Sequence, residues 1–446
     1  MPLPTDIRVR EVEVTMTHVP YRVPLKFGGV PTTEATICDV RVRVETRAGQ
    51  SAWGTGSMPL GNVWAFPSKR VPTADTERAM VRLAEAIGSA WPHVDTCAHP
   101  VELAHQFEPE ALRMAGALGR TLGLAEPIPP LATLVAASPF DAAIHDAYGR
   151  VHGRHVYECY GEAWLEPDLS AYLDAGFHGE RLPSYTRTRP KPRLPLYHLV
   201  GALDALTDAD LVERLHDGLP NTLGEWIVQD QLTHLKIKLN GNDADWDVER
   251  ILAVDRVATA TAARAYTYSL DFNEQCPHVD YLLEVLRRVQ AGSASCFDRV
   301  AYVEQPTARN LAAHPENTMH RAAALKPVVI DESLVDYASL QLARAQGYSG
   351  VALKACKGQS QSLVLAAAAQ KFGMFLCVQD LTCPGLSFLE SAGLAAHIGP
   401  VTAIEGNARQ YCPAANTDWA ARLPGVFTIR DGQIDTSGLG GVGLTA

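Results

Sequence analysis

The sequence of 446 residues has no long hydrophobic run and no apolar segment at its start. A helix that crosses a membrane needs roughly 18 apolar residues, whereas the apolar run 363–369 is followed directly by Gln370 and Lys371. Residues 1–6 lack the apolar core of a secretion signal. We therefore expect neither a membrane partner nor a secretion signal, and we expect a cytoplasmic location.

The chain also lacks paired cysteines and an excess of positive charge. Nine cysteines are scattered from Cys38 to Cys412 without a Cys-x-x-Cys pair, and free thiols in a reducing compartment are expected in a chain of this length. Asp and Glu number 50 against 39 Lys and Arg, for a net charge of −11. Nucleic acids and anionic membranes bind basic surfaces, so neither is expected as a partner.

The composition is that of a globular protein with a large core. Hydrophobic residues make up 47% and charged residues 20% of the chain, which allows two domains or one barrel with a smaller companion. Valines alternate with charged residues over 40–45, as in a half-exposed strand. Helical spacing follows over 76–124 and 140–149, whereas the Gly- and Pro-rich stretches 54–75 and 155–195 are expected to form long loops.

After residue 195, short apolar runs alternate with helical stretches. The eight apolar runs span 196–200, 235–239, 268–272, 301–304, 327–331, 350–354, 375–378 and 401–405. The helical stretches span 246–264, 281–290, 312–325, 339–346, 360–372 and 385–398. This alternation indicates a parallel sheet with crossover helices. Eight runs predict a closed α/β barrel of the TIM type, with a doubly wound open sheet as the alternative.

Most of the apolar runs end in a charged or amide residue. These residues are Lys236, Lys238, Asp271, Asn273, Glu304, Asp331, Glu332, Lys354, Asp380 and Glu405. The carboxyl ends of barrel strands form the mouth of the active site, so we expect these side chains around one rim. Asp271, Glu304 and Asp331 come from consecutive runs and supply the oxygen ligands that Mg²⁺ and Mn²⁺ prefer. No His or Cys joins them, which argues against zinc.

The lysines of this rim are suited to proton transfer. A metal at this rim would hold a substrate carboxylate and stabilise the enolate that forms when the adjacent carbon loses its proton. A lysine close to a cation and to other lysines has a lowered pKa and can act as the base. Lys238 precedes the three carboxylate strands and Lys354 follows them, so they would face each other. The alternative for any single residue is a charge that only pairs with its neighbour.

These motifs resemble the enolase superfamily, and within it the muconate lactonizing enzyme-like subgroup of the mandelate racemase/muconate lactonizing enzyme family. The matching segments are Leu-Lys-Ile-Lys at 235–238, Leu-Asp-Phe-Asn at 270–273, Val-Glu-Gln-Pro at 303–306, Ile-Asp-Glu-Ser at 330–333 and Ala-Leu-Lys at 352–354. The resemblance implies a modified (β/α)7β TIM-type barrel with an α+β capping domain. The cap would span 1–194, with segment 411–446 returning to it, and the catalytic barrel would span 195–410.

The resemblance also implies roles for individual residues. The ligands of Mg²⁺, or of Mn²⁺ in its place, would be Asp271, Glu304 and Asp331. The acid/base pair on opposite faces of the substrate would be Lys238 and Lys354, with Lys236 beside the substrate carboxylate. The residues that touch the substrate or support the ligands would be Asn273, Glu332, Asp380 and Glu405. Lys357 is expected in a supporting position, although an exchange of roles with Lys354 stays open.

The expected substrate is a small-molecule carboxylate, and the family resemblance implies a homo-oligomer. The first hypothesis is an isomerase, a racemase or epimerase. The second is a lyase or cycloisomerase, and the third is a non-catalytic metal-binding barrel. The mandelate racemase-like subgroup fits less well, because it pairs a His with an Asp where this chain has Gln379-Asp380 and Lys354. Glu405-Gly-Asn407 replaces the Asp-x-Asp of dipeptide epimerases, which argues against a dipeptide substrate.

Overall fold

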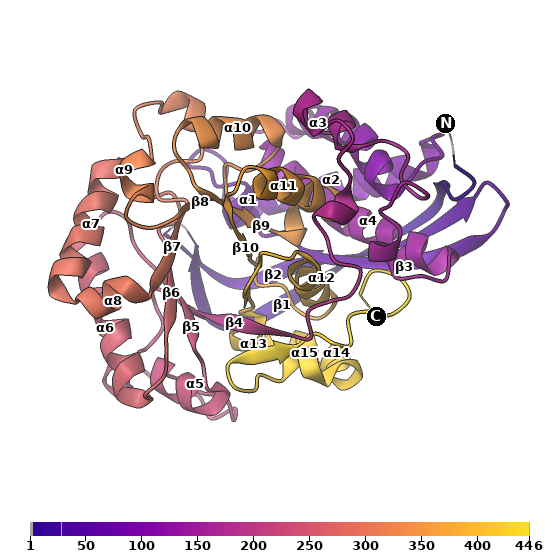
Figure 1. Ribbon diagram of the computed structural model, residues 1–446. Helices are drawn as coiled ribbons and strands as arrows, with labels where there is room; N and C mark the ends of the chain where they lie inside the picture. Colours follow the sequence, from indigo (N-terminus) through magenta and orange to yellow (C-terminus); the bar gives the residue numbers. More distant parts are fainter. Residues whose placement is uncertain (1–2, 28, 446) are drawn as a thin grey trace.

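Within the residues that the computed structural model describes, 3–27 and 29–445, eight parallel strands close into a barrel (Figure 1). The strands are β4 (Arg193–Val200), β5 (His234–Lys238), β6 (Thr267–Asp271), β7 (Val300–Glu304), β8 (Val328–Ile330), β9 (Gly350–Leu353), β10 (Phe375–Val378) and β11 (Ile404–Glu405). Each strand pairs with the next one along the chain, and β11 pairs with β4 to close the ring. The predicted barrel is confirmed, and the open-sheet alternative is wrong.

Helices on the outside connect the barrel strands. They are α5 (Leu223–Asp230), α6 (Ala244–Thr261), α7 (Val279–Gly292), α8 (Ala294–Arg299), α9 (His320–Ala323), α10 (Tyr337–Ala345), α11 (Gln359–Lys371) and α12 (Leu386–His397). The expected helix over 312–325 is wrong, because only the turn η7 (Leu311–Ala313) and the short α9 form there. Pro315 lies between them, and a proline inside a helix removes one amide donor and clashes with the preceding turn.

The cap consists of an antiparallel sheet covered by helices. Its elements are β1 (Ile7–Phe27), β2 (Val30–Thr46), β3 (Ser51–Pro59), α1 (Asn62–Ala65), α2 (Thr73–Ala90), α3 (Pro100–Thr121) and α4 (Pro130–Val151). The loop expected over 54–75 is therefore partly strand. Gly54 and Gly56 lie in β3 at the point where α4 packs onto it. Glycine is needed there because a Cβ atom at either position would overlap the α4 backbone. These glycines allow a close approach of two elements and do not mark a turn.

Residues 155–195 form the expected long connection, with isolated short turns and no long helix before β4 begins. The C-terminal elements are α13 (Ala408–Tyr411), η9 (Pro413–Asn416), α14 (Thr417–Arg422), α15 (Pro424–Phe427) and β12 (Gln433–Asp435). β12 pairs with the barrel strand β4. Beyond it, Gly443 bridges to His155, and the Leu444 amide donates to Asp146 of the cap helix α4 over 2.9 Å. The domain boundaries at residues 194 and 410 stay predictions.

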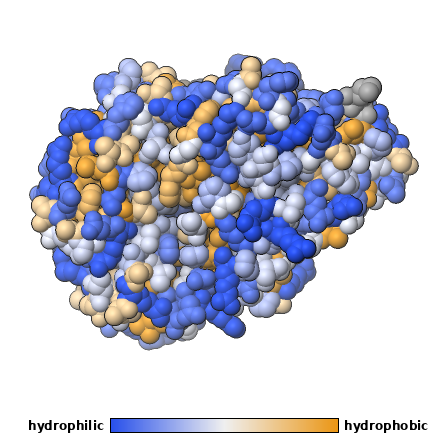
Figure 2. Space-filling view, viewed as in Figure 1, coloured by the Kyte–Doolittle hydropathy of each residue, from blue (hydrophilic) through white to orange (hydrophobic). Residues whose placement is uncertain are grey.

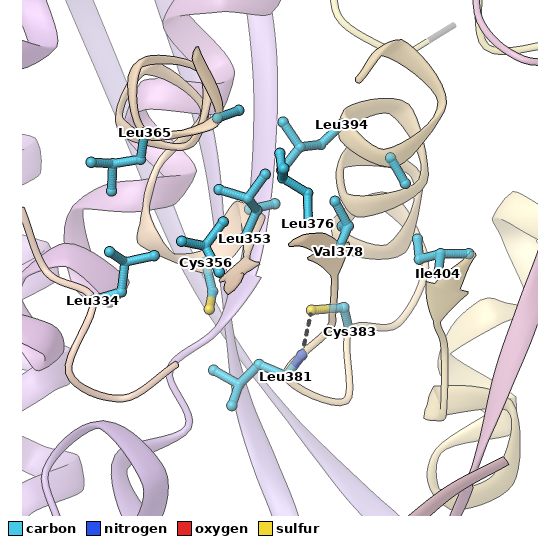
Figure 3. Close-up of a cluster of buried hydrophobic side chains, with 14 of the residues drawn as sticks. Leu334, Leu353, Cys356, Leu365, Leu376, Val378, Leu381, Cys383, Leu394 and Ile404 are labelled. Carbon is cyan, nitrogen blue, oxygen red and sulfur yellow. Dashed lines mark hydrogen bonds between the residues drawn. The ribbon is translucent and has the colours of Figure 1, made fainter. Parts of the chain in front are cut away.

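Buried aliphatic side chains hold the barrel strands against their helices. Figure 3 shows Leu353, Leu376 and Ile404 from three strands among Leu365 of α11 and Leu394 of α12. Burial of a leucine or isoleucine side chain stabilises a fold by about 1.5–3 kcal/mol. The face drawn in Figure 2 carries scattered hydrophobic residues among mostly hydrophilic ones. No helix in the described part of the chain is long and apolar enough to cross a membrane.

Candidate active site

The carboxyl ends of β6, β7 and β8 bring three carboxylates to one rim of the barrel. Asp271 ends β6, Glu304 ends β7 and Asp331 follows β8, and none of the three is exposed to solvent. Asp271 lies level with Glu304 in the strand pairing, and Lys238 of β5 lies level with Asp271. The structure therefore gathers residues that are far apart in the sequence, as strand-end positions of a parallel barrel require.

Lysine ammonium groups lie between these carboxylates. Lys236 Nζ lies 3.1 Å from Asp271 Oδ2 and 2.8 Å from Glu304 Oε2, so that it bridges the first two. Lys238 Nζ lies 2.5 Å from Asp271 Oδ2 on the same side. Lys354 Nζ lies 2.8 Å from Asp331 Oδ2. Every carboxylate of the set thus has a buried cationic partner.

Lys238 and Lys354 occupy opposite sides of the ring. Lys238 ends β5 and Lys354 follows β9, and three strands separate these two in the sheet order. In a closed ring of eight strands, a step of four strands leads to the opposite wall. The carboxylates of the intervening strands β6, β7 and β8 therefore lie between the two lysines along this rim.

Burial and charge act against each other at these groups. Burial alone would raise the pKa of Asp271, but the charges of Lys238 and Lys236 hold it below its usual value. Burial alone would lower the pKa of Lys354, but Asp331 holds it above its usual value. The charge of Lys236 acts in the opposite direction on the pKa of Lys354, but it has less effect than that of Asp331. The expected lowering of a lysine pKa beside a bound metal ion stays a prediction. The pKa of Glu304 is raised, first by burial and then by Asp271.

The donor set fits a hard divalent cation. Carboxylate oxygens are the ligands that Mg²⁺ prefers, and Asp271, Glu304 and Asp331 present them at the ends of three neighbouring strands. Glu332 Oε2 is shielded from solvent and has no hydrogen-bond partner among the described residues. No group of three His, Cys, Asp or Glu side chains in the described ranges is already arranged around one ion position, and lysine ammonium groups separate the three carboxylates.

Comparison with known proteins identifies the family of this chain. Residues 220–446, more than half of the chain, match the family model described as enolase C-terminal domain-like. The chain belongs to this family. Its predicted place in the enolase superfamily, with the mandelate racemase/muconate lactonizing enzyme family, is thereby confirmed. A comparison with curated proteins finds no match.

Solved structures of enolase-superfamily enzymes share the whole fold. The L-Ala-D/L-Glu epimerase from Bacillus subtilis is 18% identical, with a TM-score of 0.62 over 98% of this chain and 99% of that one. The muconate lactonizing enzyme from Pseudomonas fluorescens is 17% identical, with a TM-score of 0.60 over 98% and 96%. A dipeptide epimerase from Enterococcus faecalis, complexed with Mg and a dipeptide, is 15% identical, with a TM-score of 0.57 over 89% and 90%. At these identities the likeness shows the fold.

The other residues predicted for the site divide into two groups. Asn273 Oδ1 accepts from Lys238 Nζ over 2.9 Å, and Glu405 Oε2 lies 2.9 Å from Lys236 Nζ. These two side chains join the cluster of lysines and carboxylates. Asp380 accepts instead from backbone amides, among them that of Asn407 over 3.2 Å. Its carboxylate therefore holds the loop after β10, and burial, with Glu405 next, raises its pKa to about 7.

Trp64, Gln379 and Lys357 also contact this cluster, and of these three the sequence assigned a role only to Lys357, a supporting one. Trp64 of the cap helix α1 donates from Nε1 to Glu332 over 3.0 Å, and its ring centroid lies 4.5 Å from Lys354 Nζ. Gln379 donates to Glu304. Lys357 Nζ lies 3.1 Å from Asp331 Oδ1, which is a supporting position. No sequence pattern near Trp64 predicts this role, because its contacts cross from the cap to the barrel.

A cleft of about 290 Å³ between cap and barrel borders this cluster. Phe27, Trp64 and Lys69 line it from the cap, and Asn273 and Glu332 line it from the barrel. Asn273 accepts a hydrogen bond from Lys238, and Glu332 accepts one from Trp64. The cleft therefore ends beside the cluster, at Asn273 and Glu332.

Proposed function

We propose that the chain is a Mg²⁺-dependent racemase or epimerase that removes the proton α to a substrate carboxylate. Lys238 and Lys354 would be the acid/base pair, and Asp271, Glu304 and Asp331 would hold the metal. The observation that carries the proposal is the placement of Lys238 and Lys354 on opposite sides of the ring, with the three carboxylates between them. Such a pair can take a proton from one face of a carbon and return one to the other.

Bound Mg²⁺ would supply the positive charge that draws in a substrate carboxylate and favours loss of the adjacent proton. Asp271 and Asp331 would then share their negative charge with the ion, which weakens their hold on Lys238 and Lys354. One of these lysines, in its neutral form, accepts the α-proton. The other lysine, in its charged form, donates a proton to the opposite face. Lys236, held between Glu304 and Glu405, would offset the charge of the substrate carboxylate.

The experiment is solvent exchange at the α-carbon. The purified chain with Mg²⁺ is incubated in heavy water with a library of chiral carboxylates, and deuterium incorporation is followed by NMR. We expect exchange and loss of optical purity with some members of the library. Lys238→Ala should exchange only one enantiomer and Lys354→Ala only the other. Absence of exchange across the whole library would contradict the proposal.

A lyase or cycloisomerase that uses the same proton abstraction is the second candidate. The observation that favours it is the ring of Trp64 beside Lys354 Nζ, since an aromatic face stabilises the charged form of a lysine. Lys354 would then stay charged and support the enolate, and Lys238 alone would act as the base. Loss of exchange in Lys238→Ala but not in Lys354→Ala would favour this reaction.

A non-catalytic metal-binding barrel is the third candidate, and it would bind Mg²⁺ without turning over any carboxylate. The Mg-containing dipeptide epimerase of the same fold supports Mg²⁺ as the ion, with Mn²⁺ as a possible substitute to be compared in the same assay. A homo-oligomer and a cytoplasmic location stay predictions from the sequence. Sedimentation of the purified chain measures the oligomeric state directly.

A further inference from the structure

A second cavity of about 290 Å³ lies between the cap helices α3 and α4 and the barrel helices α10 and α11. α11 packs against both cap helices, in the upper part of the molecule in Figure 1. The cavity shares no lining residue with the cleft beside Asn273 and Glu332. It is therefore a separate place where a ligand could be held.

The walls of this cavity are largely apolar and aromatic. The rings of Trp91 and Phe107 stack with centroids 4.1 Å apart, and His105 meets the Tyr172 ring edge-on at 5.2 Å. Small and aliphatic side chains, among them Val364, complete the lining. The volume is nearly twice that of an engineered cavity of about 150 Å³ that binds benzene. An aromatic ring with a short chain therefore fits.

Three oxygen-bearing groups on the wall have no partner among the described residues. Within the described part of the chain, no hydrogen bond or ion pair reaches the carboxyl of Glu108, whose side chain is half-buried. The hydroxyl oxygen of Tyr172 and the amide oxygen of Gln361 are shielded from solvent and also lack partners. A buried polar atom without a partner costs about 1–3 kcal/mol. All three groups can accept hydrogen bonds, and an alkylammonium group carries three N–H donors.

The charges around the cavity also favour a cation. Burial, followed by the charges of Asp336 and Asp141, raises the pKa of Glu108 to about 7. Lys357 lines the cavity but is already held in an ion pair on the barrel side. Burial lowers the pKa of His105, so this side chain is neutral near pH 7 and above. Negative charge thus exceeds free positive charge at the wall.

We propose that this cavity binds a small organic ammonium ion with an aromatic or aliphatic body. The ammonium group pairs with Glu108 and donates to the oxygens of Tyr172 and Gln361. The apolar walls bury the body of the ligand, with Phe107 as the main aromatic contact. This site requires neither bound metal nor turnover at the barrel rim, so its test is independent of the proposed enzymatic activity.

The test is isothermal titration calorimetry at pH 8 with the full chain. The probes are 2-phenylethylamine, which is charged at this pH, the neutral 2-phenylethanol and the anionic 3-phenylpropanoate. We expect the amine to bind at least roughly tenfold more tightly than the alcohol and the anion not to bind. Glu108→Gln should weaken binding of the amine by at least roughly tenfold and leave that of the alcohol unchanged.

Two further variants act as controls. Glu110→Gln removes a carboxylate from the same helix that pairs with Arg113 and does not line the cavity, and it should bind both probes as the wild type does. Ala104→Leu places a larger side chain on the cavity wall and should abolish binding of both the amine and the alcohol. Equal affinities for the amine and the alcohol, undiminished amine binding in Glu108→Gln, or no binding of any probe would each overturn the proposal.

Discussion

Replacing Lys236 by methionine should unbalance the buried charge at the barrel rim. The Lys236 side chain is 2% exposed, and its ammonium lies 2.8 Å from Glu304, 2.9 Å from Glu405 and 3.1 Å from Asp271. Methionine keeps most of the side-chain volume but removes the counter-charge that the three carboxylates share. Removal of one partner of a buried ion pair costs about 3–5 kcal/mol, since the remaining charge stays buried.

This loss can be converted into a melting temperature. With about 2.1 cal/mol/K of unfolding entropy per residue, a chain of 446 residues has an unfolding entropy of about 0.9 kcal/mol/K. Lys236→Met should therefore melt about 3–5 °C below the wild type in EDTA, provided that unfolding is a single transition. Added Mg²⁺ should raise the melting temperature of the variant more than that of the wild type, because the ion replaces the missing charge. Differential scanning calorimetry measures both effects.

The surface pair of Lys371 and Glu180 supplies the control. Their side chains are 31% and 30% exposed, and an exposed ion pair contributes about 0–1 kcal/mol. Lys371→Met should therefore melt within about 1 °C of the wild type, with or without Mg²⁺. A melting temperature of Lys236→Met at or above that of the wild type in EDTA would refute the charge argument. A melting temperature independent of Mg²⁺ in both proteins would contradict the proposed metal site.

Three other predictions concern packing, pH and the cap. Gly56→Ala should destabilise the fold by about 1–3 kcal/mol, because its Cβ would overlap the α4 backbone. Chemical denaturation measures this loss. The control Gly399→Ala has open space around its Cβ and should leave the free energy of unfolding unchanged. Burial, followed by the charges of Asp336 and Asp141, raises the pKa of Glu108 from an ordinary 4.5 to about 7. This shift contributes stability that is fully present below pH 4.5 and is lost as the pH rises through 7. The wild type should thus lose melting temperature relative to Glu108→Gln between pH 5 and 7.5, and parallel curves would contradict this. Trp64→Phe keeps a ring beside Lys354 but loses the hydrogen bond to Glu332, so the rate of α-proton exchange should fall a few-fold. Trp64→Ala loses both contacts, and its exchange rate should fall about tenfold or more. Equal exchange rates in the two variants would rule out a role for the ring.

The barrel and the residues at its rim could be predicted from the sequence, for a physical reason. Parallel strands buried on both faces read as continuous apolar runs, so each run stands out from the amphipathic helices around it. A charged residue at the end of such a run, as in Asp271 or Lys354, is costly to bury unless it has a partner. The recurrence of such ends at successive strands therefore predicted one shared site, and in the structure these side chains form ion pairs at the rim, Lys238 with Asp271 and Lys354 with Asp331.

Contacts between cap and barrel were decided by the tertiary structure alone. The ring of Trp64 reaches Lys354 from a segment almost three hundred positions earlier in the chain. Gly54 and Gly56 suggested a loop, but they serve the packing of β3 on α4. Local sequence determines which residues favour a strand, a helix or a turn, because these preferences depend on near neighbours. Which surfaces then approach each other depends on packing across the whole chain, so the cavity beside Glu108 could be found only in the folded structure.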